Sequence, residues 1–220
     1  MAPGIHIIRA EVSGFCSGVK RALQLAEDSG GDNSSGPVYT YGDLVHNDQV
    51  MKHLSEQGIS SISSLHNIES GTVIIRAHGA AVETLNVLTR KGIRIVDATC
   101  PKVKRSHRII EKYTARGFHI IIAGEPDHSE VRGLVSRAQN FDVVESVAMV
   151  GELSCTSPIL LIAQTTFSPT VYKAICDAAR KRYPQVEISR TICPAMEQRH
   201  EAVERLAARV DAILIIGGNK

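Results

Sequence analysis

The sequence predicts an α/β protein built from repeated small units, and three observations support this prediction. Short apolar runs typical of buried strands alternate with helical patterns along all 220 residues. The composition is 43% hydrophobic but only 4% aromatic, so we expect a core of Val, Ile, Leu and Ala. Finally, a cysteine precedes a helical pattern at three places, Cys16, Cys100 and Cys193.

The first unit is expected to open with a strand over residues 5–8, which are mostly apolar. A helix follows Cys16 and runs to about residue 27, before a loop rich in Gly, Ser and Asn over residues 30–36. The remaining expected elements are strands over residues 38–41, 73–76 and 93–96, a helix through Val50 and Leu54, and a helix through Leu85 and Leu88.

The second unit repeats this order from Cys100 onward. Pro101 favours the first position of a helix, which is expected to end before Gly117. Ser168 and Pro169 form a second helix start of the same kind, with a capping side chain before a proline. The other expected elements are strands over residues 120–123, 143–144, 159–163 and 186–188, and a helix through Val131, Leu134 and Val135.

The third unit contains only a helix after Cys193 and a strand over residues 212–216. The cysteines recur roughly every 90 residues, a period that suggests repeated domains rather than a solenoid. We therefore expect three α/β repeats over residues 1–99, 100–192 and 193–220, with the third incomplete. If they pack around a pseudo-threefold axis, the three cysteines converge.

Charge and hydropathy exclude several classes of function. A net charge of +2 gives no electrostatic case for nucleic-acid binding. No apolar run approaches the roughly 20 residues that a membrane helix needs, and no secretory signal is recognisable. A cytoplasmic protein is therefore expected, in which five cysteines are better explained as thiols or metal ligands than as disulfides.

The three repeated cysteines suggest a metal site with one open position. Helix N-termini favour negative charge, and three thiolates without a fourth ligand suit an iron–sulfur cluster better than a closed structural zinc site. The alternative is that each cysteine is a small buried apolar residue. We adopt that interpretation for Cys155 and Cys176, which lie outside the repeat.

Three histidines, His46, His78 and His128, each follow an expected strand beside small or polar residues. Because ligands of open α/β sheets bind at the carboxyl ends of strands, these imidazoles could hold a phosphorylated ligand together with helix N-termini. A structural role is the alternative for each of them. Four further histidines lack this context and are expected to be surface or core residues: His6, His53, His66 and His119.

Glu130, two residues beyond His128, is a candidate general acid if its surroundings exclude water. Its alternative role is a first-turn carboxylate that interacts with the helix dipole. Thr165 and Thr166 follow the strand over residues 159–163 and could donate hydroxyl hydrogen bonds, or serve only as strand-end caps.

Six separated motifs together resemble the 4-hydroxy-3-methylbut-2-enyl diphosphate reductases of the LytB type. The resemblance spans the whole chain in order. The motifs are Gly14-Phe15-Cys16-Ser17-Gly18-Val19, Val45-His46-Asn47, Ala77-His78-Gly79, Asp97-Ala98-Thr99-Cys100-Pro101, His128-Ser129-Glu130 and Gln164-Thr165-Thr166.

The resemblance implies a trefoil of three α/β domains around a [4Fe–4S] cluster, with the three repeated cysteines as its ligands. It also implies that the three strand-end histidines and both threonines line the substrate pocket, and that Glu130 and Thr165 deliver protons. The reaction would be a two-electron reductive dehydroxylation giving isopentenyl and dimethylallyl diphosphates, the last step of the methylerythritol phosphate pathway. Electrons would come from a ferredoxin or flavodoxin.

The same resemblance implies that the family continues beyond Lys220 into a Ser-Ser-Asn phosphate loop. We therefore expect the chain to be truncated in its third domain. An alternative function follows from this expectation, namely an inactive homologue that binds a metal or a partner without turnover. A third interpretation is a two-domain binder of phosphate ligands whose thiols are structural.

Overall fold

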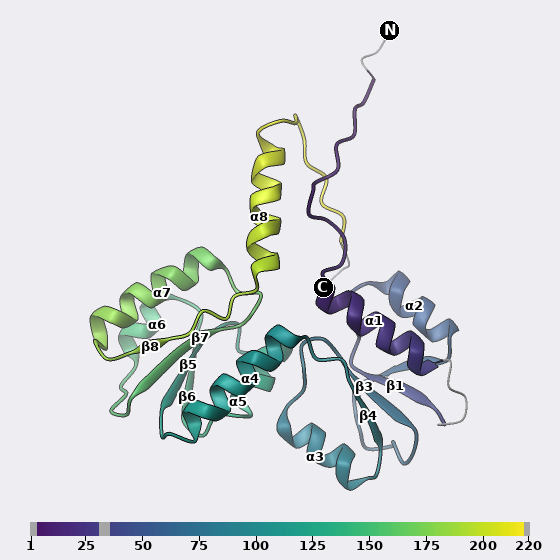
Figure 1. Ribbon diagram of the computed structural model, residues 1–220, viewed down its shortest axis with the longest axis horizontal. Helices are drawn as coiled ribbons and strands as arrows, with labels where there is room; N and C mark the ends of the chain where they lie inside the picture. The colour runs from purple at the N-terminus through teal and green to yellow at the C-terminus, as the bar shows by residue number, and fades with distance from the viewer. Residues whose placement is uncertain (1–3, 31–35, 218–220) are drawn as a thin grey trace.

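The computed structural model describes residues 4–30 and 36–217 and contains two separate parallel sheets of four strands each. The strand orders are β2-β1-β3-β4 and β6-β5-β7-β8, so the second sheet repeats the topology of the first. This repetition confirms the predicted α/β class and the predicted recurrence of one unit. Figure 1 shows the two units side by side, with one helix, α8, rising between them.

The first unit consists of β1 (Val38–Tyr41), β2 (Ile59–Ile62), β3 (Thr72–Ile75), β4 (Arg94–Asp97), α1 (Ser17–Gly30), α2 (Asp48–Glu56) and α3 (Val82–Arg90). All four residues of β3 are buried, because this strand lies inside the sheet with helices on both faces. Ala22 and Leu54 of α1 and α2 pack on one face, and Leu88 of α3 packs on the other.

The second unit consists of β5 (His119–Ala123), β6 (Phe141–Val144), β7 (Ile159–Ala163), β8 (Glu187–Ile188), α4 (Pro101–Thr114), α5 (Ser129–Val135), α6 (Val147–Glu152) and α7 (Pro169–Arg182). Val150 and Ile175 of α6 and α7 pack on one face of this sheet, and Ile110 and Leu134 of α4 and α5 on the other. Ser168 accepts a hydrogen bond from the amide of Val171, which confirms the predicted cap of α7.

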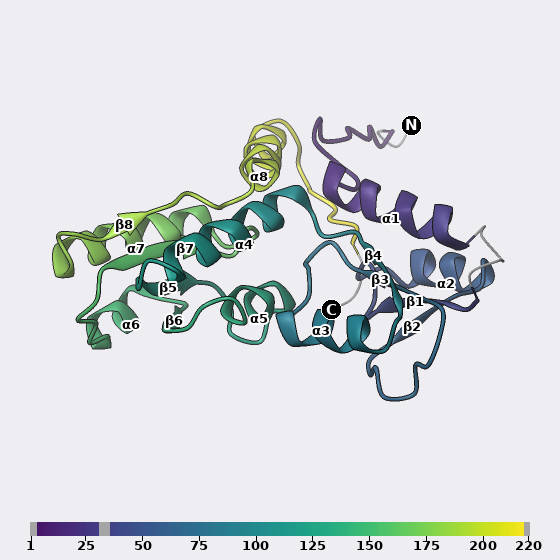
Figure 2. The same ribbon diagram turned by 60° about the horizontal axis from the view of Figure 1, so that its bottom comes forward.

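Helix α8 (Pro194–Ala207) contacts the N-terminal segment. The Arg199 guanidinium donates a hydrogen bond to the carbonyl of Gly14, and Arg205 forms an ion pair with Glu11. These contacts join α8 to the segment before α1, and Figure 2 shows the two beside each other near α1.

Two predicted strands are wrong. Residues 5–8 and 212–216 form no strand, and their apolar side chains are open to solvent: Ile5 is 93% exposed and Leu214 is 83% exposed. The physical reason is that a strand needs a neighbour for its backbone N–H and C=O groups, and neither segment pairs with another in the part of the chain that the structure describes. The loop expected over residues 30–36 falls mainly on 31–35, outside the described residues.

Two further elements were not expected from the sequence. Strand β2 contains two exposed serines, and α6 is six residues long, too short to show a helical period. No helix among the described residues is long and apolar enough to cross a membrane.

Candidate active site

Each of the three repeated cysteines lies at the start of a helix, as predicted. Cys100 and Cys193 are the N-caps of α4 and α8, and each is followed by a proline. The carbonyl of Cys16 accepts a hydrogen bond from the amide of Lys20 in the first turn of α1. The thiols of Cys100 and Cys193 make no capping hydrogen bond, so their sulfur atoms remain available to a ligand.

A cavity of about 230 Å³ is lined by all three cysteines. His78, Glu130, Thr165 and Thr166 line the same cavity, so seven of the nine sequence-predicted site residues converge there. The remaining wall is mainly apolar and includes Phe15, Val19, Ala77, Val103, Ala195 and Met196. The predicted convergence of the thiols is therefore present in the fold.

Gly18 keeps the space beside two of these thiols open. A Cβ atom at this position would lie 2.7 Å from the Cys100 sulfur and 3.9 Å from the Cys16 sulfur. No side chain can occupy a position 2.7 Å from a sulfur atom without displacing it. Because α1 begins at Ser17, this glycine lies in the first turn of the helix that follows Cys16.

Glu130 is completely buried, and Thr165 holds both of its carboxyl oxygens. The amide of Thr165 donates to Oε1 at 2.7 Å, and its hydroxyl donates to Oε2 at 2.8 Å. Burial raises the pKa of Glu130 from its ordinary 4.5 to about 7, although the two bonds from Thr165 oppose this shift. The carboxyl group therefore carries a proton for a large part of the time near neutral pH, as a general acid requires.

The three predicted histidines meet from three separate loops. The ring centroids of His46 and His78 are 6.2 Å apart, and those of His78 and His128 are 5.3 Å apart. Burial lowers the pKa of His78 to about 4, with smaller contributions from His128, Arg76 and His46. Its Nδ1 atom is buried without a protein hydrogen-bond partner among the described residues, which leaves one polar atom available to a ligand.

Arg76, directly after β3, adds positive charge near His78, and the sequence analysis did not identify it. Its pKa is lowered, chiefly by burial, while Tyr41 and Asp43 act in the opposite direction. The Nε atom of Arg76 is also buried without a partner in the described structure. The signal that could have identified this residue is its position, two residues before His78 at a strand end.

Thr166 differs from Thr165 in its partner. Its hydroxyl accepts a hydrogen bond from Nε2 of the Gln164 side chain at 2.8 Å. The side-chain Oε1 atom of Gln164 accepts one from the backbone amide of Glu125 at 3.1 Å. Gln164 thus joins the loop after β7 to the loop after β5. Thr166 lines the cavity, but the hydrogen bonds to the buried carboxyl group come from Thr165.

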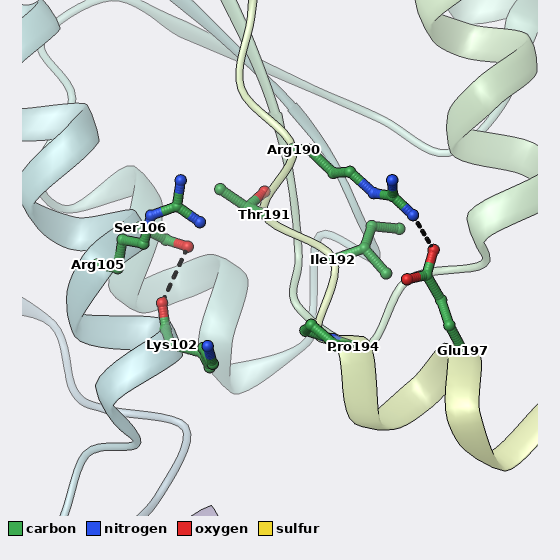
Figure 3. Close-up of a pocket in the computed structure, with 8 residues that line it drawn as sticks. All are labelled: Lys102, Arg105, Ser106, Arg190, Thr191, Ile192, Pro194 and Glu197. Atoms are coloured by element: carbon green, nitrogen blue, oxygen red, sulfur yellow. Dashed lines mark hydrogen bonds and ion pairs between the residues drawn. The ribbon is translucent and has the colours of Figure 1, made fainter.

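A second cavity of about 320 Å³ lies beside the first, and Lys102 lines both. Figure 3 shows that its walls come from α4, from the segment before α8 and from α8 itself. Three of its lining residues are cationic, namely Lys102, Arg105 and Arg190, and Arg190 forms an ion pair with Glu197. None of the described cysteines or histidines lines this cavity, so it does not share the chemistry of the first.

Fold and site together define an α/β protein with three convergent thiols beside a buried acid and a histidine cluster. The family model for the LytB protein matches residues 7–220. The chain therefore belongs to the LytB family, as its sequence motifs predicted.

Relatives and solved structures agree with this assignment. The 4-hydroxy-3-methylbut-2-enyl diphosphate reductase of Geotalea uraniireducens is 37% identical over 215 residues, which are 97% of this chain and 76% of the relative. The enzyme of the same name from Aquifex aeolicus is 38% identical, with 97% and 75% covered. The chain thus spans about three quarters of these relatives.

Two solved structures share the fold. A structure of (E)-4-hydroxy-3-methyl-but-2-enyl diphosphate reductase has a TM-score of 0.79 and 36% identity, and the match covers 93% of this chain and 74% of that one. The Plasmodium falciparum E-1-hydroxy-2-methyl-but-2-enyl-4-diphosphate reductase has a TM-score of 0.84 and 28% identity, with 89% and 63% covered.

Proposed function

We propose that this chain catalyses the reductive dehydroxylation of 4-hydroxy-3-methylbut-2-enyl diphosphate to isopentenyl and dimethylallyl diphosphates. The observation that carries the proposal is that three helix-capping thiols and a buried carboxyl group of raised pKa line one cavity. Membership of the LytB family and the names of its relatives support the choice of substrate.

The proposed cofactor is a [4Fe–4S] cluster held by Cys16, Cys100 and Cys193. Three thiols of one cavity match the donor set of such a cluster, and Gly18 leaves the space between two of them unfilled. When bound, the cluster supplies Lewis-acid and one-electron chemistry at an iron that has no protein ligand. The mainly apolar remainder of the wall keeps water away from the bound substrate.

Glu130 is the proposed proton donor. Replacing the hydroxyl group with hydrogen consumes two electrons and two protons: one proton leaves with the hydroxyl oxygen as water, and the other joins the allylic carbon. A carboxyl group with a pKa of about 7 can give up its proton and be protonated again near neutral pH. Thr165 fixes the orientation of this group through its amide and hydroxyl.

His46, His78 and His128 are the proposed diphosphate ligands. The unpartnered Nδ1 atom of His78 and the positive charge of Arg76 support this role, because both favour an anion at the histidine cluster. Thr166 also lines the cavity and is proposed to contact the substrate there.

The proposed architecture is a trefoil in which residues 1–99, 100–192 and 193–220 each contribute one cysteine. The equal strand orders of the two sheets and the third cysteine-capped helix support this division. A pseudo-threefold arrangement explains why thiols so far apart in the sequence line a single cavity.

A ferredoxin or flavodoxin is the proposed electron donor. Such carriers are acidic, and the cationic second cavity in Figure 3 shares Lys102 with the thiol-lined cavity. We expect Lys102→Glu to slow reduction by the protein donor and to weaken its dependence on salt, while reduction by a small dye is unchanged. Lys173→Glu, on α7, is the control.

The experiment that tests the function begins with anaerobic purification and a count of iron and acid-labile sulfide. We expect about four of each per chain, lost in Cys100→Ser and retained in Cys176→Ser, because Cys176 packs in the core away from the cavity. Product formation from substrate and a reduced dye should follow the iron content. Little iron after reconstitution, or a full cluster without product, would refute the proposal.

A further inference from the structure

Three potential metal ligands of different kinds meet at a place far from the thiol-lined cavity. The ligand atoms of His119, Asp142 and Cys155 all lie within 4.8 Å of one another, and all three residues are partly buried. The Nε2 atom of His119 lies 2.7 Å from Oδ2 of Asp142. The sequence analysis assigned no function to His119 or Cys155, because they are 36 residues apart and share no motif.

The fold explains how these residues come together. His119 is the first residue of β5, and Asp142 pairs in register with Ile121, so both side chains project from the same face of the sheet. Cys155 lies in the connection from α6 to β7 and packs against the core on that face. The connection is held in place where the Tyr183 hydroxyl donates to the Leu153 carbonyl at 2.8 Å.

This cluster is separate from the proposed active site. It lies at the amino end of β5, whereas His128 and Glu130 follow the carboxyl end of the same strand. The five residues of β5 alone separate the two ends by about 13 Å. No residue of the cluster lines the thiol-lined cavity.

We propose that His119, Asp142 and Cys155 form a binding site for a zinc-class divalent cation, with water as the fourth ligand. Imidazole nitrogen, carboxylate oxygen and thiolate sulfur are all zinc ligands, whereas magnesium and calcium prefer oxygen alone. A carboxylate and a thiolate together balance the charge of the ion. In tetrahedral zinc, neighbouring ligand atoms lie about 3.3–3.7 Å apart, so side-chain movements of about 1 Å complete the site.

The simpler interpretation is a partly buried hydrogen bond between His119 and Asp142 in which Cys155 takes no part. The two interpretations differ in what Cys155 does. If the site binds zinc, the thiol is a ligand and its replacement lowers affinity. The bound ion would also connect β5, β6 and the α6–β7 connection, and so stabilise the second unit against unfolding.

The test is zinc binding by the iron-loaded chain, dialysed anaerobically at buffered free zinc. We expect about one zinc ion per chain in addition to the iron. His119→Asn, Asp142→Asn and Cys155→Ser should each lower zinc affinity at least about tenfold without changing the iron count. His53→Asn and Asp177→Asn, at exposed positions outside the cluster, are the matched controls and should bind zinc as the unmodified chain does.

X-ray absorption at the zinc edge identifies the ligands directly. We expect one sulfur at about 2.3 Å and nitrogen or oxygen ligands at about 2.0–2.2 Å. Three sulfur ligands would mean that zinc occupies the thiol-lined cavity instead, and would overturn the proposal. Absence of zinc, or binding that survives all three substitutions, would overturn it too. As a second measurement, zinc should raise the midpoint of thermal unfolding of the chain but not of Cys155→Ser.

Discussion

The buried carboxyl group of Glu130 makes the free energy of unfolding depend on pH in a defined direction. Its pKa is about 7 in the folded chain and near 4.5 when the side chain is exposed by unfolding. Between these values the folded chain holds a proton that the unfolded chain has lost, so stability falls by about 1.4 kcal/mol per pH unit. The contribution is fully present below pH 4.5 and is lost as pH rises through 7, roughly 3 kcal/mol in all.

Glu130→Gln should remove this dependence. The amide has the shape of the acid, its oxygen can still accept the bond from the Thr165 amide, and it does not ionise. Denaturant titrations give the free energy of unfolding of both proteins at each pH. Between pH 4 and pH 8.5, the value for the variant minus the value for the unmodified chain should increase by roughly 3 kcal/mol. The same substitution should lower turnover by about 10²–10⁴-fold, because it removes the proposed proton donor.

Glu125→Gln, at an exposed carboxylate in the same loop, is the control and should keep the pH dependence of the unmodified chain. Parallel stability curves for Glu130→Gln and the unmodified chain would refute the reasoning. They would mean that Glu130 is ionised in the fold, and its role as a proton donor would then lose its physical basis.

Three further predictions concern the same cavity. Gly18→Ala should lower the iron content without unfolding the chain, because the added Cβ would lie 2.7 Å from the Cys100 sulfur. Gly151→Ala is the control and should leave the iron content unchanged, because its Cβ would meet no atom within 4 Å. Thr165→Val removes a hydrogen bond that lowers the pKa of Glu130, so the decline of activity at alkaline pH should move to higher pH. Binding of inorganic diphosphate should raise the pKa of His78, so the chain should take up protons on binding. Calorimetry in buffers of different ionisation enthalpy measures this proton uptake. If the His78→Asn variant took up as many protons as the unmodified chain, the prediction would be contradicted.

The sequence predicted the helix-capping cysteines and the central strands well because their signals are local. Pro101 and Pro194 each fix a helix start one residue after a cysteine. An entirely apolar strand such as β7 is stable only when both of its faces are buried. The exposed segments 5–8 and 212–216 carry the same apolar pattern but form no strand, because a strand depends on a neighbour that the pattern does not specify.

The electrostatics of the site could not be predicted from the pattern alone. In the sequence, Glu130 is an ordinary first-turn carboxylate of α5, and burial in the folded chain is what raises its pKa. The neutral state of His78 likewise depends on burial and on Arg76, a residue with no motif of its own. Nor could spacing reveal that His119 and Cys155 meet, because that contact depends on the register of β5 and β6.

One repeated backbone contact explains how the proposed cluster ligands and the proposed substrate-binding loops are held together. The amide of Cys100 donates to the carbonyl of Ala77, next to His78, at 2.9 Å, and the amide of Cys193 donates to the carbonyl of Thr165 at 2.8 Å. Each bond therefore ties the cysteine of one repeat to the loop of the preceding repeat, which offers an imidazole in the first case and a hydroxyl in the second. A shift of either partner would break one of these backbone hydrogen bonds, so each thiol is positioned together with the polar group of the preceding repeat.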